Sequence, residues 1–184
     1  MRSILIVLAV LSLVGCASSS PAPSAASPSQ VELASGRTSA HGMTLAAVAR
    51  PPVVAPGEVI EVVAELTNDG DEPIVLSGSG SGLVFFSVTR LDDGLTSGPA
   101  VHTDDCATHE LPAGVTTTVP FAKSGGWSEN DPNAAFLRTF FSEPELTLPA
   151  GRWRIDITTA GSVGEGCTGE PIGLELALVV TVTE

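Results

Sequence analysis

The stretch of this chain that alternates most regularly is VIEVVAELT, residues 59–67. Its apolar side chains at the even positions would face a core, while Glu61 and Glu65 would face water. A period of two is typical of a half-buried β-strand, because successive side chains of a strand point to opposite faces. The following residues, Asn68 to Asp71, include Asn, Asp and Gly, which tolerate the backbone angles of tight turns. The stretch therefore predicts a sheet strand followed by a turn.

Similar short apolar stretches, separated by turn residues, continue from about Met43 to the end of the chain. The longest is residues 172–183, where apolar and polar side chains again alternate. Further strands are expected at residues 74–76, 83–90, 115–121 and 153–159. Seven or eight such strands with little helix favour an all-β fold, an antiparallel immunoglobulin-like β-sandwich formed by residues 41–184.

The sequence Leu-Pro-Ala-Gly occurs twice, at residues 111–114 and 148–151, each time before an expected strand. Together with NDGDEPIVL at 68–76, residues 85–94 and RWRI at 152–155, these turns resemble the layout of BsuPI-type intracellular proteinase inhibitor domains. The resemblance covers about residues 43–160. It implies an immunoglobulin-like sandwich and, as an alternative function, inhibition of a proteinase. This chain departs from that family in its N-terminal signal, its cysteine pair and an extra segment at 127–141, and no inhibitory residue can be transferred.

The N-terminal residues resemble an export signal. Arg2 precedes an apolar run at residues 4–14, which as a helix of about 1.5 Å per residue is too short for a bilayer core of about 30 Å. Such a run is typical of a signal peptide. Its end, Leu13-Val14-Gly15-Cys16, resembles the lipobox of bacterial lipoproteins.

The lipobox resemblance implies that residues 1–15 are removed and that acyl chains such as palmitate are attached to Cys16. The domain would then be held by lipid on the extracytoplasmic side of the cell membrane or of an outer membrane. The alternative is that Cys16 is a buried thiol beside an ordinary cleavage site. Residues 16–40 are expected to form a disordered tether, because Ala, Ser and Pro dominate its first half and offer little to bury.

The charge of the chain excludes one class of partner. It has 8 basic and 21 acidic residues, a formal net charge of −13. A negative surface repels nucleic acid, so a role in DNA or RNA binding is rejected.

Two cysteines, Cys106 and Cys167, remain once Cys16 carries lipid. Cysteines of exported proteins most often pair, so a disulfide is expected between them. The alternative is a metal site formed by Cys106, His102 and His109, whose spacing fits no common zinc motif. No metal or cofactor is therefore expected.

No motif in the sequence specifies a catalytic site. Residues 78–82 alternate Gly and Ser, but they lack the Lys-Ser/Thr that a phosphate-binding loop needs, and a turn or bulge is expected there. The chain is therefore predicted not to be an enzyme.

The long connection at residues 123–145 is the candidate binding loop. It contains Trp127, Phe136 and Phe140, and long connections in compact domains are often functional. Exposed aromatic side chains would anchor a protein partner. The alternative is that these rings cover an open edge of the sandwich, and a short helix around residues 132–139 is compatible with either.

These observations lead to the hypothesis of a lipid-anchored envelope protein with a non-catalytic interaction domain. Its expected partners are the membrane, through the N-terminal lipid, and a protein at the envelope. Proteinase inhibition is the first alternative and an envelope enzyme is the second.

Overall fold

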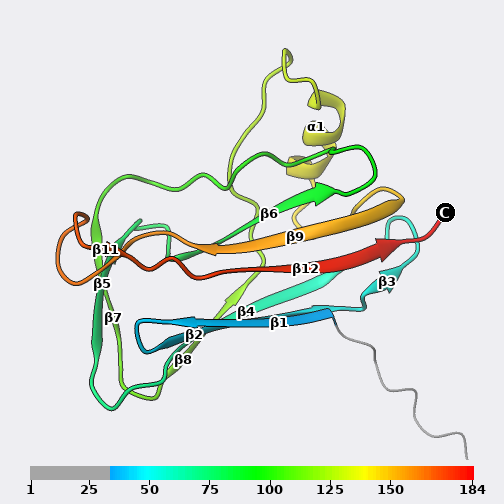
Figure 1. Ribbon diagram of the computed structural model, residues 1–184. Helices are drawn as coiled ribbons and strands as arrows, with labels where there is room; N and C mark the ends of the chain where they lie inside the picture. The colour runs from blue at the N-terminus through cyan, green and yellow to red at the C-terminus, as the bar shows by residue number, and fades with distance from the viewer. Residues whose placement is uncertain (1–33) are drawn as a thin grey trace, which may run out of the picture. The chain divides into compact units, whose positions relative to one another are not determined.

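The computed structural model describes residues 34–184 (Figure 1). These residues form twelve strands, three of them only two residues long, and one helix. In chain order the elements are β1 (Ala34–Ala40), β2 (Met43–Arg50), β3 (Val53–Val54), β4 (Glu61–Asn68), β5 (Ile74–Gly78), β6 (Val84–Arg90), β7 (Ala107–Leu111), β8 (Thr116–Pro120), α1 (Ala134–Ser142), β9 (Gly151–Thr159), β10 (Ser162–Val163), β11 (Glu170–Pro171) and β12 (Glu175–Val182). No helix in this part of the chain is long and apolar enough to span a membrane.

The strands form three sheets. One has the order β1-β2-β4-β8, the second β3-β12-β9-β6 and the third, smaller in extent, β11-β10-β5-β7. Figure 1 shows β6, β9 and β12 as one layer above β1, β2 and β4, with β5, β7 and β11 at one end. All pairings are antiparallel except that of β3 with β12. The expected all-β sandwich is confirmed, with more strands than the seven or eight expected.

The predicted alternation of β4 is confirmed. Val62, Ala64 and Leu66 are at most 2% exposed, whereas Glu61 and Glu65 face water. Burial of a Val or Leu side chain stabilises a fold by about 1.5–3 kcal/mol, so a one-residue slip of this strand would be costly. The opposite layer contributes its own buried set: Trp153, Ile155 and Ile157 from β9, and Leu178, Val180 and Val182 from β12.

The folded domain begins earlier than the sequence suggested. Ala34–Ala40 were assigned to the tether, but they form β1 and pair with β2 along their whole length. A turn at His41 and Gly42, both with positive φ, reverses the chain between them. All residues of β1 except Arg37 are small, and a Cβ at Gly36 would lie 3.4 Å from Leu176, so β1 packs closely against β12. The boundary expected at residue 40 therefore lies too late in the chain, and the rest of the expected tether, before Ala34, lies outside the described residues.

The turn after β4 is organised by Asn68, which is fully buried. Its Nδ2 donates to the carbonyls of Glu72 (2.8 Å) and Leu111 (2.9 Å), and its Oδ1 accepts from the amide of Gly70 (2.9 Å). Leu111 and Leu148, which begin the two Leu-Pro-Ala-Gly turns, are also buried. Both turns therefore anchor loops to the core.

Candidate interaction site

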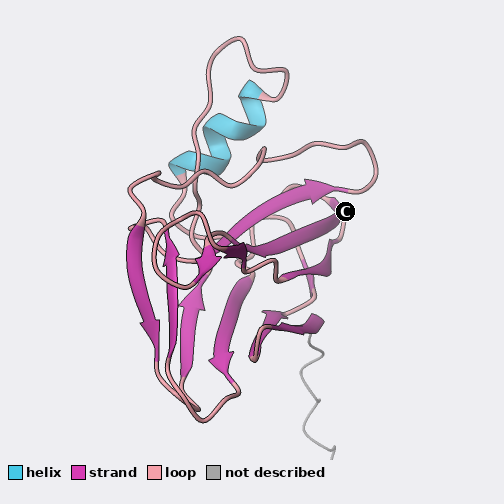
Figure 2. Ribbon diagram, turned by 60° about the vertical axis from the view of Figure 1, so that its left-hand side comes forward, coloured by secondary structure: helices cyan, strands magenta, loops and turns pink. Residues whose placement is uncertain are grey.

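The connection between β8 and β9, residues 121–150, contains α1, and we call it the α1 segment. Figures 1 and 2 show α1 and its flanking loops outside the two layers of strands, on the side of β6. The helix has nine residues and buries Leu137 and Phe140, which are spaced three apart and so share one face. The expectation of a short helix in this region is confirmed, two to three residues further along the chain.

Two of the three predicted binding residues face the domain. Phe140 is 4% exposed and belongs to the hydrophobic core. Phe136 is partly buried, and its ring stacks on that of Trp153 at a centroid distance of 5.5 Å. The prediction that Phe140 anchors a partner is therefore wrong, because its ring has no free surface to offer. These two rings have the alternative role, that of covering the sandwich.

Trp127, the third predicted binding residue, keeps part of its side chain exposed to solvent. The guanidinium of Arg138 lies 5.1 Å above its ring. Arg138 in turn pairs with Glu129 at 2.7 Å. Arg138 therefore holds the indole against α1 through a cation–π contact, while part of the ring remains in contact with water.

Lys123 joins the start of the α1 segment to the end of its helix. Its Nζ donates to the backbone carbonyls of Phe140 (2.5 Å), Glu143 (2.6 Å) and Glu145 (2.7 Å). It also lies 4.5 Å from the centre of the Phe140 ring. The last carbonyls of a helix lack partners within it and attract cations, so the ammonium suits the carbonyls of Phe140 and Glu143 at the end of α1. The Glu145 carbonyl lies beyond the helix and also accepts from the amide of Thr147. Burial lowers the pKa of Lys123, and the nearby Glu143 carboxylate opposes this shift.

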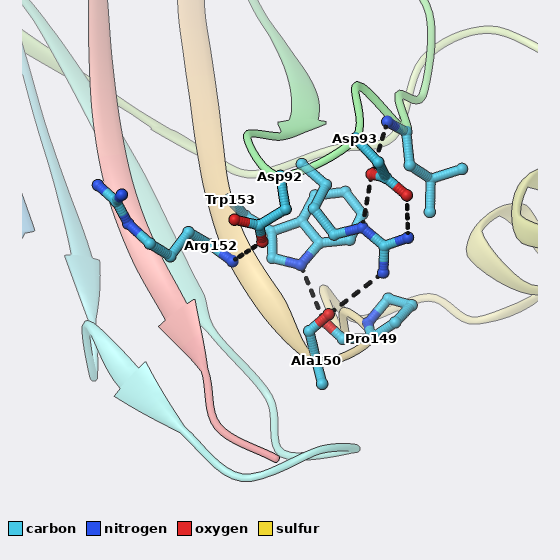
Figure 3. Close-up of polar contacts among 8 residues, drawn as sticks. Asp92, Asp93, Pro149, Ala150, Arg152 and Trp153 are labelled. Atoms are coloured by element: carbon cyan, nitrogen blue, oxygen red, sulfur yellow. Dashed lines mark hydrogen bonds and ion pairs between the residues drawn. The ribbon is translucent and has the colours of Figure 1, made fainter.

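The far end of the α1 segment is held by a second cluster (Figure 3). The indole N–H of Trp153 donates to the carbonyl of Pro149 at 2.8 Å, and the amide of Arg152 donates to Asp92 at 3.0 Å. Arg90 donates to the carbonyl of Ala150 at 3.2 Å and stands 5.7 Å over the ring of Trp153. The bonds of Arg90 and Asp92 tie residues 150–152 to the end of β6 and the turn after it, while the indole of Trp153 holds residue 149.

Asp93 fixes the orientation of Arg90. Its two carboxylate oxygens accept from Nε (2.8 Å) and Nη2 (2.6 Å) of that guanidinium. This pairing lowers the pKa of Asp93 to about 2, aided by the amide of Leu95, and raises the pKa of Arg90. Both carry full charge at neutral pH.

A small cleft separates the α1 segment from the loop after β6. It encloses about 220 Å³ between residues 96–101 and 125–137, with Leu137 among its lining residues. Asp131 also lines this cleft, but its carboxylate accepts from the amide of Asn133 at 3.0 Å and so serves the local turn.

The predicted disulfide between Cys106 and Cys167 is present, with a Cα–Cα distance of 5.7 Å. It links the residue before β7 to the loop between β10 and β11. Beside it, Asp105 accepts from the amide of Gly80 at 2.6 Å and from the hydroxyl of Thr103 at 2.9 Å. The Gly/Ser run at 78–82 is thus a fixed turn.

The histidines have separate surroundings. The ring of His102 packs against Phe85 at 5.2 Å, and that of His109 contacts the carbonyl of Ser79 at 3.0 Å. Within residues 34–184 no group of three or more His, Cys, Asp or Glu residues is placed to hold a metal ion.

Sequence reasoning missed Lys123 and Arg90, which bind carbonyls 17 to 60 residues away. It also missed Asp93, although its partners Arg90 and Leu95 lie within three residues of it. Cys16, the predicted lipidation site, lies outside the described residues. The sequence matches no protein-family model and no curated protein.

Proposed function

We propose that this chain is a lipid-anchored protein of the bacterial envelope whose sandwich is a non-catalytic interaction module. The α1 segment supports the module: it stands outside the sandwich, is held at both ends and carries the partly exposed Trp127. The anchor rests on the lipobox at Cys16.

A held loop suits binding for a physical reason. Ordering a flexible loop on association costs free energy, and a loop already ordered in the free protein avoids that cost. At one end of the α1 segment, the contacts of Lys123 provide this order. At the other end, Trp153 and Arg90 provide it through their bonds to the carbonyls of Pro149 and Ala150. Tryptophan is also among the residues that contribute most to protein interfaces.

The binding surface can be tested by photocrosslinking in intact cells. A photoreactive amino acid at position 127 should give a discrete crosslinked protein. The same amino acid at position 179, an exposed residue of β12, serves as the control. Equal adducts from both positions, or none from position 127, would contradict a partner at the α1 segment.

The anchor is tested separately with Cys16→Ser. The unchanged chain should incorporate radiolabelled palmitate and stay with the membrane fraction, whereas the variant should incorporate none and be released. Equal labelling of both chains would exclude Cys16 as the lipidated residue without bearing on the α1 segment.

Inhibition of a proteinase is the alternative function. It also requires a loop that is held at both ends, so the same α1 segment supports it. Purified protein can be titrated into trypsin-like and subtilisin-like proteinases. Stoichiometric inhibition that is lost in Trp127→Ala would favour the inhibitor, and unchanged proteinase activity would favour the interaction module.

A further inference from the structure

The interior of the sandwich is open to solvent beside β7 and β8, which end two different sheets. In β8, Thr117 pairs with the buried Leu66 and so points to the interior, yet its side chain is exposed. Val119, on the same face of β8, is only half-buried. In β7, His109 pairs with the fully buried Leu76 and is half-buried as well. Three side chains that point inward are therefore still in contact with water.

A cavity of about 250 Å³ lies between these two strands, and we call it the β7–β8 cavity. Most of its wall is formed by apolar side chains that belong to the core or pack against it. These side chains are Leu66, Leu76, Leu83, Val84, Leu111 and Val119. A molecule that enters the β7–β8 cavity therefore contacts the apolar interior of the sandwich.

At about pH 8, above the usual titration range of histidine, no lining residue directs a charged side chain into the cavity. Glu110 follows His109 in β7, so its side chain points to the opposite face of the strand. His109 donates from Nε2 to the carbonyl of Ser79 at 3.0 Å. Ser81 and Thr117 carry neutral hydroxyl groups, and neither lysine nor arginine lines the cavity. A charged group that entered would lose its water without gaining a partner of opposite charge.

Size and lining together define the ligand. If each non-hydrogen atom takes about the 30 Å³ of a water molecule in the liquid, the cavity holds on the order of eight such atoms. An apolar group that replaces water against apolar walls gains free energy. We propose that the β7–β8 cavity binds a compact, uncharged and mainly apolar molecule, such as a small aromatic alcohol. This site is separate from the α1 segment and does not depend on the proposed interaction function.

Three probes of similar size and different charge test the proposal: benzyl alcohol, benzylammonium and benzoate. The mature chain with Cys16→Ser is titrated with each, at about pH 8 and physiological ionic strength, and followed by amide chemical shifts. Benzyl alcohol should bind at least about tenfold more tightly than either ion, because the ions must give up the hydration of their head groups. The amides that shift should be those of β7, β8 and residues 81–84.

Two neighbouring positions of β8 provide a matched pair of variants. Thr117→Phe places a ring in the β7–β8 cavity and should weaken binding of benzyl alcohol about tenfold or more. Thr118→Phe adds the same ring on the opposite face of the strand, where residue 118 pairs with Glu65, and should leave binding unchanged. Both threonines are exposed, so neither change should unfold the chain. Val119→Phe, on the inward face, should repeat the effect of Thr117→Phe and gives an independent measurement.

Three results would overturn the proposal. The first is that benzyl alcohol shifts no amide of β7 or β8 at millimolar concentration. The second is that either ion binds as tightly as benzyl alcohol, which would contradict a site for uncharged molecules. The third is that benzyl alcohol binds equally well to Thr117→Phe and Thr118→Phe, which would place the ligand outside the β7–β8 cavity.

Discussion

Among single residues, Lys123 connects parts of the α1 segment that lie about twenty residues apart. Lys123→Met keeps most of the stem of the side chain but removes three charge-assisted hydrogen bonds to carbonyls. We expect the free energy of unfolding to fall by about 1–3 kcal/mol, since the Phe140 carbonyl would lose a partner that water replaces poorly. Urea denaturation measures the change.

The control for Lys123 is Arg154→Met, which removes an exposed ion pair with Asp156. Exposed pairs contribute about 0–1 kcal/mol, so this variant should change stability little. Equal losses in the two variants would show that removal of a positive charge, and not the three carbonyl contacts, is responsible.

Asp93 gives the protein a defined response to acid. Its pKa is about 2 in the folded chain and 3.8 ordinarily, so the unfolded chain binds a proton first as pH falls. The stabilisation from the Arg90–Asp93 pair is therefore complete above about pH 4 and is lost as pH falls through about 2. Asp93→Asn should make the free energy of unfolding depend less on pH between these values than in the unchanged chain.

The matched change for this experiment is Asp71→Asn, which removes one negative charge from the exposed turn after β4. Denaturation curves collected at several acidic pH values compare the three proteins. A pH profile that is the same in Asp93→Asn and the unchanged chain would contradict the role of the Arg90–Asp93 pair.

Among the elements, α1 has an inner and an outer aromatic residue whose truncation should have different effects. Phe140→Ala should lower the free energy of unfolding by about 3–5 kcal/mol, as expected for a buried ring. Trp127→Ala should cost about 1 kcal/mol, close to the value of its cation–π contact with Arg138. Chemical denaturation checks both, and similar large losses would show that Trp127 is also core.

The elements that sequence alone could predict are those with a strong local pattern. The strands β4 and β12 alternate over their whole length and are found where expected. By contrast, β1 consists of small and polar residues that resemble a linker, and β7 reads Ala-Thr-His-Glu-Leu with little alternation. β1 is a strand because it pairs with β2, and β7 is a strand because it pairs with β5. Such pairing between segments cannot be read from a local sequence pattern.

In the candidate site too, sequence could predict only the features that do not depend on contacts between distant residues. The disulfide could be predicted from the count of cysteines together with the expectation that the chain is exported. The contact between Arg90 and Ala150 spans 60 residues, and those of Lys123 span about 20, so their partners are set by the fold. Phe140 could not be separated from Trp127 in sequence, because burial depends on the side of the helix that faces the domain.

At the scale of the whole molecule, the disulfide closes a loop of 61 residues between the start of β7 and the β10–β11 loop. Its loss in Cys106→Ser/Cys167→Ser should lower the free energy of unfolding by about 4 kcal/mol on the loop-entropy model. Thermal denaturation with and without reductant measures this loss. Reductant should destabilise the unchanged chain and have no effect on the variant, and an unaffected unchanged chain would contradict the prediction.

The placement of the two tryptophans gives the molecule built-in optical reporters. The chain has no tyrosine, so near-ultraviolet excitation is absorbed mainly at Trp153 and Trp127. Trp153 is fully enclosed by the core and should emit at short wavelength, out of reach of dissolved iodide, until the sandwich unfolds. Trp127 touches solvent, so iodide should quench it, and a partner that covers the α1 segment should shield it. Fluorescence alone can therefore distinguish occupation of that surface from loss of the fold.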